Sequence, residues 1–159
     1  MSEPRWLDER EQQAWRSLMV MQAGLSEYLE RQLRAHSGLS SADYEVLAHL
    51  SEAPGGRMRS FALARVLRWE KGRLSQHLTR MQKRGLIRRE PCPTDQRGAV
   101  VVITEPGRAL IEKATPLHLA NVRNVLIDHA TPAQLDLLTE LADQVRTRLA
   151  QIEQQTRSG

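Results

Sequence analysis

Residues 60–89 read SFALARVLRWEKGRLSQHLTRMQKRGLIRR, and this stretch decides the fold. A short helix is expected over 60–67 and a second over 70–84, joined by a tight connection of a few residues. Gly85 suits the left-handed position just past the second helix. The apolar residues of that helix recur at helical spacing, at Leu74, Leu78 and Met81. Two helices joined in this way, the second one basic, predict a helix-turn-helix.

The chain then changes period and predicts two short strands, over 86–89 and 100–103. The two prolines between them are expected to end strand pairing, and Gly98 is expected to serve the turn. The tip of this β-hairpin presents Arg97, which can enter a minor groove, and Asp95 is close enough in sequence to orient it. A helix-turn-helix followed directly by such a hairpin is a winged helix.

The positive charge of the chain is concentrated in the same middle segment. The net charge is +4 overall, but residues 57–113 hold 14 Lys or Arg against 5 Asp or Glu, a net +9. Residues 1–56 carry a net −4 and residues 114–159 a net −1. A concentrated basic segment is the electrostatic footprint of a protein that binds a phosphate backbone, although a solvated, charge-rich surface gives the same count.

The polar face of the 70–84 helix carries side chains of the types that hydrogen-bond base edges and phosphates. An ordinary polar helix face is the alternative interpretation for any one of them. Together with the hairpin residues, the candidate DNA-contacting set is Arg73, Ser75, Gln76, His77, Thr79, Arg80, Lys83, Arg84, Asp95 and Arg97.

Two helices are expected before this segment. The first covers about 8–36 and shows an apolar face at helical spacing. Ser40 or Ser41 can then cap the second helix. The run Pro54-Gly55-Gly56 breaks the chain into a loop before the helix-turn-helix begins.

Two more helices are expected after the hairpin. Thr104 caps a long helix that runs towards His129, and Pro116 is expected to kink it. Residues 131–134, TPAQ, form a full start signal for a last helix. The apolar stripe of that helix is about five turns long and needs a partner face, either in this chain or on the same surface of a second subunit.

The sequence resembles a known family, the MarR-type regulators. The run from Leu63 through Trp69-Glu70-Lys71-Gly72-Arg73-Leu74-Ser75 to Arg80-Met81 and Arg84-Gly85-Leu86-Ile87-Arg88 looks like the core of that family. Asp95-Gln96-Arg97, followed by a strand, Thr104 and Gly107, looks like its wing signature. The resemblance is strongest over residues 60–110. Gly72 departs from it, because a serine is common near the start of the second helix.

The resemblance implies a mainly α fold, a winged helix-turn-helix with a two-stranded β-hairpin wing and N- and C-terminal dimerisation helices. The whole chain, 1–159, would be a single MarR-type domain, with the winged helix-turn-helix over 40–104 and dimerisation helices over 8–36 and 105–155. It also implies a homodimer that binds a pseudo-palindromic operator in double-stranded DNA, usually as a repressor that a small molecule or an oxidant releases.

Two effector signals are open to more than one interpretation. Trp15, Tyr44 and His49 are candidate ligand-binding residues, because the resembled family often takes aromatic or phenolic ligands in a crevice, but plain core packing explains them equally well. Cys92 is a redox candidate, since neighbouring arginines can lower the pKa of a thiol. The sensing cysteines of the family usually lie near the first helix, so an ordinary surface thiol is the simpler interpretation of Cys92.

Other function classes find no support in the sequence. The five histidines and the one cysteine show no metal-ligand spacing, and no glycine-rich phosphate loop or nucleophile elbow appears, so we expect no metal, no cofactor and no enzyme. No apolar run is long enough to span a membrane and no secretory signal begins the chain, so we expect a cytoplasmic protein. The alternatives to a sequence-specific regulator are a non-specific architectural DNA binder and a non-catalytic dimeric interaction module.

Overall fold

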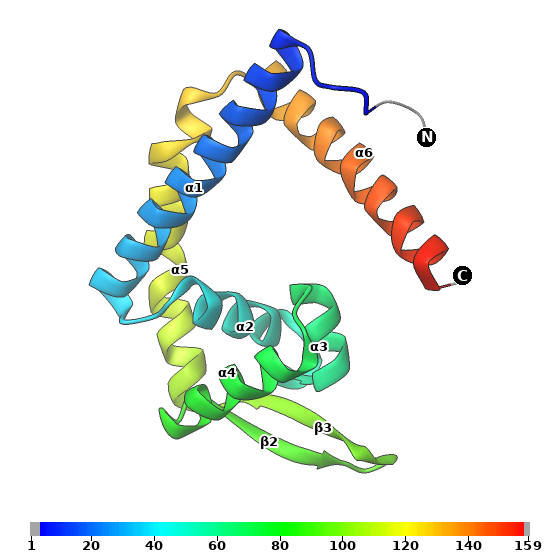
Figure 1. The fold of residues 1–159 in the computed structure, drawn as a ribbon. Coiled ribbons are helices and arrows are strands. Elements are labelled where there is room, and N and C mark those ends of the chain that lie inside the picture. Colours follow the sequence, from blue (N-terminus) through cyan, green and yellow to red (C-terminus); the bar gives the residue numbers. More distant parts are fainter. Residues whose placement is uncertain (1–3, 158–159) are drawn as a thin grey trace. The chain divides into compact units, whose positions relative to one another are not determined.

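The computed structural model describes residues 4–157, apart from the side chains of residues 95–97. It is mainly helical with one small antiparallel sheet (Figure 1). The elements in chain order are α1 (Glu9–Ser37), α2 (Ser41–Glu52), the 3-10 turn η1 (Pro54–Gly56), β1 (Arg57–Arg59), α3 (Ser60–Leu67), α4 (Lys71–Lys83), β2 (Ile87–Cys92), β3 (Asp95–Ile103), α5 (Glu105–Val125), the 3-10 turn η2 (Ile127–His129) and α6 (Pro132–Arg157).

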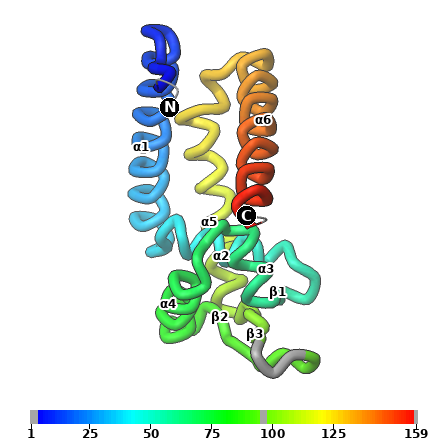
Figure 2. The backbone as a smooth tube through the Cα atoms, turned by 45° about the vertical axis from the view of Figure 1, so that its right-hand side comes forward, coloured from blue at the N-terminus to red at the C-terminus, as the bar shows by residue number. Residues whose placement is uncertain are grey.

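The described residues form two compact units, one up to Leu119 and one from Ala120 onward, so the boundary falls inside α5. In the first unit α2, α3 and α4 pack together against the sheet (Figures 1 and 2). The second unit consists of the end of α5, η2 and α6. The single domain over residues 1–159, with its two dimerisation segments, stays a prediction.

The helix ends follow the local signals of the sequence. Ser40 caps α2, because its hydroxyl accepts a hydrogen bond from the backbone of Asp43 while the Asp43 carboxylate accepts from the backbone of Ser40. Thr131 and Gln134 make the same reciprocal pair at the start of α6. Gly85 takes the left-handed conformation, with φ 75°, where the chain leaves α4. These predicted boundaries are confirmed.

The hydrophobic core lies inside the winged helix-turn-helix. Its fully buried side chains come from α2, α3, α4, the sheet and the first half of α5, and include Leu47, Leu50, Leu63, Leu78, Met81, Ile87 and Val101. In contrast, α1 buries only Leu33, and α6 buries none of its described residues. The two terminal helices therefore contribute little to the core of the chain itself.

The sheet differs from the expectation in two ways. It has three strands in the order β1-β3-β2, because Arg57–Arg59 pairs with Val100–Val102 and adds a strand that the sequence pattern did not reveal. The hairpin is also longer than predicted. Pro91 does not end pairing but lies opposite Ala99, which β2 tolerates because it is an edge strand. The turn falls at Pro93 and Thr94, so the expectation that Gly98 serves it is wrong; Gly98 lies within β3.

Helix α5 begins where the hairpin ends and ties the two together. The hydroxyl of Thr104 donates to the carbonyl of Gly85 and accepts from the backbone N–H of Gly107. A Cβ atom at Gly107 would collide with the carbonyl oxygen of Leu86, so this close approach of helix to hairpin needs glycine. The helix continues through Pro116 to Val125, and η2 takes up the rest of the span that was predicted to reach His129.

Candidate nucleic-acid interface

Helix α4 has one buried face and one exposed face. Leu74, Leu78 and Met81 are buried in the core, as the spacing predicted. The exposed face carries five of the predicted contact residues, Arg73, Ser75, Gln76, Arg80 and Lys83. The buried face holds α4 on the core of the winged helix-turn-helix. The exposed face therefore presents side chains of the types that contact bases and phosphates.

His77 and Arg84, two other predicted contact residues, are turned towards Asp43 of α2. The His77 Nε2 atom lies 3.0 Å from one carboxylate oxygen of Asp43, and an Arg84 guanidinium nitrogen lies 2.7 Å from the other. Arg84 also donates to the carbonyl of Gly38. The side chain of Asp43 is 5% exposed and that of His77 is 12% exposed. This cluster joins the first turn of α2 to the recognition-type helix α4.

The charge state of Asp43 follows from these contacts. Burial by itself raises the pKa of this carboxyl group, but hydrogen bonds from His77, Arg84 and the backbone of Ser40 hold it well below its usual range. Asp43 is therefore ionised at neutral pH. A buried carboxylate needs such partners, because an unpaired one costs several kcal/mol.

Trp69 supports the same helix from its N-terminal side. The Arg73 guanidinium lies over the Trp69 ring, 4.4 Å from its centroid, and the ring of His77 meets Trp69 edge-on at 5.3 Å. Cation–π contacts of this kind restrict where an arginine head group can lie. Trp69 also packs against the core, so it anchors the turn that precedes α4.

Thr79 lies at the border between the two faces of α4. Its hydroxyl donates to the carbonyl of Ser75 and accepts from the Arg89 guanidinium of β2. Arg89 also donates to the side chain of Gln82. These bonds attach the hairpin to α4. Thr79 and Arg89 therefore have a structural role, whether or not they also contact a ligand.

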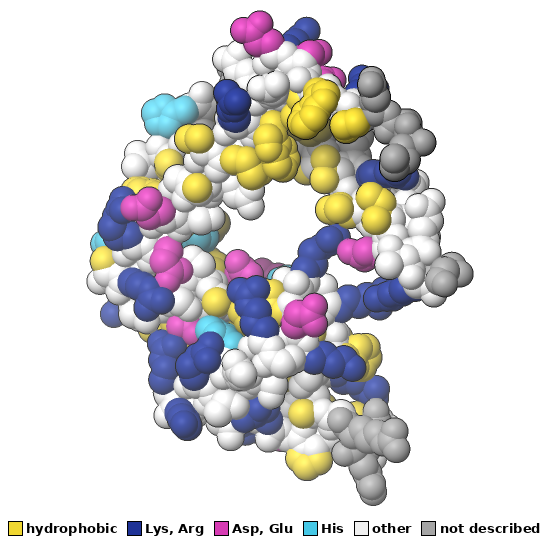
Figure 3. Space-filling model, viewed as in Figure 1, with side chains coloured by type: hydrophobic (Ala, Val, Ile, Leu, Met, Phe, Trp, Pro, Cys, Tyr) yellow, Lys and Arg dark blue, Asp and Glu magenta, His cyan; other side chains and the backbone are white. Residues whose placement is uncertain are grey.

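The hairpin adds positive charge next to α4. Arg57 and Arg88 both pair with Glu90, at 2.9 Å each, on the outer surface of the sheet. In Figure 3, Lys and Arg side chains gather over the part of the molecule that holds α4 and the sheet. The predicted wing residues Asp95 and Arg97 belong to β3, but their side chains lie outside the described residues. Their role stays a prediction.

Cys92 is not the surface thiol that the sequence suggested. It is 6% exposed, and its sulfur lies 3.4 Å from the hydroxyl oxygen of Thr94. It borders a cavity of about 280 Å³ between α3, α4 and the hairpin, which Arg59, Lys71 and Arg89 also line. The redox proposal for Cys92 stays untested, although burial limits the access of an oxidant to its sulfur.

The candidate effector residues do not converge. Tyr44 borders a cleft of about 600 Å³ between α1, α2 and α5, but Trp15 and His49 are absent from its lining. His118 takes their place, with its ring 4.3 Å from that of Tyr44, and burial lowers the pKa of His118. The apolar wall comes from α1 through Leu25, Leu29 and Leu33. Tyr44 also donates to Thr115 of α5.

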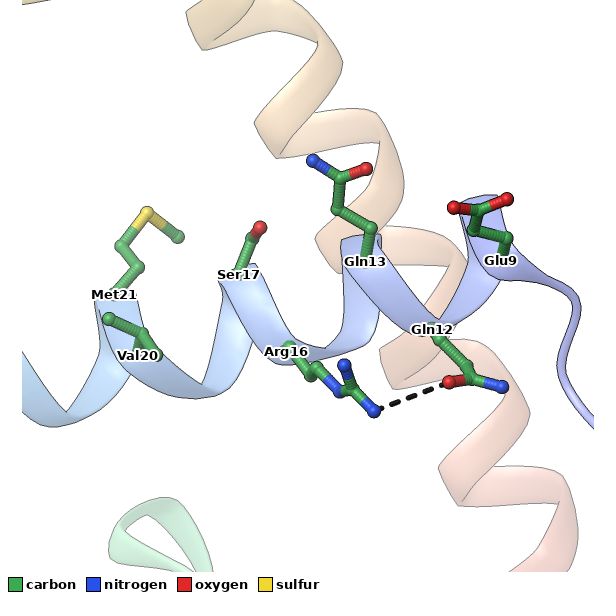
Figure 4. A pocket seen from close by; sticks show the side chains of 7 residues that line it. All are labelled: Glu9, Gln12, Gln13, Arg16, Ser17, Val20 and Met21. Atoms are coloured by element: carbon green, nitrogen blue, oxygen red, sulfur yellow. Dashed lines mark hydrogen bonds between the residues drawn. The ribbon is translucent and has the colours of Figure 1, made fainter.

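A second hollow, of about 590 Å³, lies along the first three turns of α1 (Figure 4). All seven lining residues belong to that one helix, and Arg16 donates to Gln12 among them. A hollow along one side of a single helix offers no enclosing wall, so it carries no argument for a binding site.

The described residues contain no group of three or more His, Cys, Asp or Glu arranged to hold a metal ion. Within the same residues, no helix is long and apolar enough to cross a membrane.

Comparison with known proteins places this geometry in a family. The model of the MarR family matches residues 37–98. The structure of AbsC, a MarR family transcriptional regulator from Streptomyces coelicolor, is 39% identical, with a TM-score of 0.89 over 92% of this chain and 99% of that one. This chain belongs to the MarR family. The family is one of transcriptional regulators.

Two further relatives agree with the assignment to the MarR family. Sco3205, a MarR family transcriptional regulator from the same organism crystallised in complex with DNA, is 36% identical, with a TM-score of 0.88 over 90% of each chain. The transcriptional regulator HosA of Escherichia coli O111:H- is 33% identical over 79 residues, which cover 50% of this chain and 57% of HosA.

Sequence reasoning missed two residues of this MarR-family structure, Asp43 and His118, and the contacts of a third, Arg89. Asp43 was assigned no role, although an acid three residues after a capping serine is a recognisable signal for a capping box. Its contact residues His77 and Arg84 lie 34 and 41 residues further along the sequence, so the local sequence pattern does not predict these contacts. His118 and Arg89 depend in the same way on which elements pack together.

We predict that Asp43→Asn destabilises the protein by about 2–4 kcal/mol at pH 7, because a neutral amide replaces the buried carboxylate that His77 and Arg84 contact. The native pKa of Asp43 lies below its unfolded value of about 3.9, so the carboxylate contributes its full stability above that pH and loses it as the pH falls further. The difference in free energy of unfolding between wild type and variant is therefore expected to shrink progressively as the pH falls below about 4.

Chemical denaturation at a series of pH values measures this difference. Asp143→Asn is the matched control, because Asp143 pairs with Arg146 on an exposed face of α6 and its loss is expected to cost less than about 0.5 kcal/mol. A gap between wild type and Asp43→Asn that stays constant down to pH 3 would contradict the assignment.

Proposed function

We propose that the protein is a transcriptional repressor that binds a pseudo-palindromic operator as a homodimer and leaves it when a small ligand binds. The observation that carries the DNA-binding part is the exposed face of α4. A helix locked on its other side by the core and by Asp43 offers Ser75, Gln76 and three cations to a ligand. This role requires binding and no catalysis, and it is compatible with the proposed cytoplasmic location.

The likeness to Sco3205 supports the same role. That protein was crystallised with DNA, and the similarity covers 90% of this chain at 36% identity. By analogy α4 would enter a major groove and the hairpin would approach the flanking minor groove. Two-fold symmetry then places the half-sites about one helical turn apart, roughly 34 Å.

The contact residues divide into two groups in this proposal. Ser75 and Gln76 are suited to base edges, and Arg73, Arg80 and Lys83 to phosphates or guanines. The wing contributes Arg97, supported by Asp95, as the sequence predicts. His77 and Arg84 contact Asp43 of α2, so in this proposal they hold α4 in place and do not contact DNA directly. Thr79 is occupied by Arg89 and contributes to the shape of the surface.

We predict that Gln76→Ala and Lys83→Ala weaken DNA binding in different ways. Loss of a base-edge contact at Gln76 is expected to cost roughly 1–3 kcal/mol and to relax the preference at one base position. Loss of a phosphate contact at Lys83 is expected to weaken binding equally on all sequences and to reduce the salt slope by about 1. Selection from a random duplex library, followed by titration at several salt concentrations, measures both effects.

The same selection tests the proposal as a whole. A palindromic motif supports the repressor. Steeply salt-dependent binding without a motif would indicate an architectural DNA binder instead. Absence of binding would leave the dimeric interaction module as the better interpretation.

The homodimer part of the proposal rests on the two terminal helices. Helix α6 exposes Leu138, Leu141, Val145, Leu149 and Ile152 at helical spacing. Helix α1 exposes Trp15, Leu18 and Met19 in the same pattern. Exposed apolar stripes of this length are unfavourable in water, and a second copy of the chain can cover them with the same residues.

We predict that Leu141→Glu converts the protein to a monomer, because it places a charge in the centre of the α6 stripe. Thr139→Glu is the matched control, two residues away on the opposite face of the same helix. Sedimentation equilibrium measures the mass, and DNA binding is expected to fall with the dimer. A Leu141→Glu protein that keeps the mass of a dimer would refute the role of α6.

The cleft between α1, α2 and α5 is the place we propose for the effector. Its lining joins three leucines to one phenol, one imidazole and the carboxylates of Glu27, Glu30 and Glu45, and the lowered pKa of His118 favours the neutral ring at physiological pH. Such a lining suits a small aromatic or phenolic molecule. Trp15 and His49, the other two residues suggested by sequence, are not part of it.

We predict that phenol, used as the probe, lowers the affinity for operator DNA and that Leu29→Trp abolishes this response by filling the cleft. His49→Gln is expected to respond as the wild type does, because His49 is absent from the lining. Titration of phenol into the DNA-binding assay measures the response. An equal response of all three proteins would exclude this cleft as the site of action.

A further inference from the structure

The exposed arginine Arg80 is held by a buried histidine of its own helix. Its guanidinium lies 3.2 Å from the Nδ1 atom of His77, three residues earlier. Residues at this spacing lie on adjacent parts of one helical face, so the contact needs no other element. Arg80 reaches the surface that α4 presents to solvent, whereas His77 is almost entirely covered.

Asp43 decides which nitrogen of His77 can accept a hydrogen bond. Because the Asp43 carboxylate is ionised and lies 3.0 Å from Nε2, its negative charge favours the tautomer that carries the proton on that nitrogen. The Nδ1 atom of a neutral imidazole is then left with a lone pair. A guanidinium group has donors and no acceptor, so the pairing of Nδ1 with Arg80 requires this tautomer.

The ring of His77 has little freedom to move. Trp69 meets it edge-on, and Asp43 is itself held by Arg84 and by the backbone of Ser40. The orientation of Arg80 is therefore set by a chain of contacts that begins on α2. An arginine that is oriented before it meets its ligand loses less conformational entropy on binding.

We infer that His77, oriented by Asp43, is a positioning residue that aims Arg80 at one base pair of the DNA site. This inference rests on the proposed function. Without the Nδ1 acceptor, the guanidinium of Arg80 loses its contact with His77, and the sequence preference at that base pair weakens.

Two substitutions at position 77 separate the two nitrogen atoms. His77→Asn keeps an acceptor near the position of Nδ1 and loses the contact with Asp43. His77→Gln keeps a donor near the position of Nε2 and loses the acceptor for Arg80. The binding of each full-length variant to a duplex with the selected motif, and to duplexes changed at single base pairs, is compared with that of wild type and Arg80→Ala.

We expect His77→Gln to bind the motif roughly tenfold more weakly, with the loss confined to the base pair that Arg80→Ala also affects. His77→Asn is expected to keep that preference, and the Gln substitution to have no further effect in an Arg80→Ala background. Equal behaviour of the Asn and Gln variants would overturn the inference, because a merely structural role of His77 does not distinguish them.

The failure of this inference is distinguishable from the failure of the proposed function. A protein that selects no motif refutes the proposed function together with this inference. A protein that selects a motif, and whose preference is unchanged in His77→Gln, refutes the inference alone.

Discussion

The carboxylate of Asp43 is the one charged side chain that the described part of the chain buries, and the position of α4 depends on it. One oxygen faces His77 in the middle of α4, and the other binds Arg84 at its end. The same group caps the first turn of α2, and Arg84 extends the contact to the carbonyl of Gly38. Apolar packing places α4 on the core, but it does not specify how a helix is rotated or shifted along its axis as strictly as these directional bonds do.

The contacts of Asp43 with α4 divide the polar residues of that helix into two groups. Those that point away from α2, such as Gln76 and Lys83, are available to a ligand. Those that point towards it, His77 and Arg84, are part of the framework. A sequence shows both kinds as one polar face, because a histidine or an arginine suits a phosphate and a buried carboxylate equally well. The burial of Asp43 is what separates them.

The features that the sequence predicted correctly are those with local causes. The cap at Ser40, the start signal at Thr131 and the left-handed Gly85 each depend on residues within one turn, and the helices between them follow from apolar spacing. The third strand was missed because Arg57–Arg59 is too short to show a period and exists through its pairing with β3. Pro91 was misjudged because its tolerance depends on β2 being an edge strand, which is a property of the whole sheet.

The first turn of α2 also borders the two clefts of the winged helix-turn-helix unit that face α1. Asp43 lines the cleft next to α4, and Tyr44, the following residue, lines the cleft next to α5. Glu30 of α1 lines both and accepts a 2.6 Å hydrogen bond from the backbone of Ser41. A ligand that displaced Tyr44 would move the backbone that carries Asp43, and the bonds from Asp43 to His77 and Arg84 would carry that movement to α4. Successive residues of a helix point in different directions, so one turn is enough to join the proposed effector cleft to the surface proposed to read DNA.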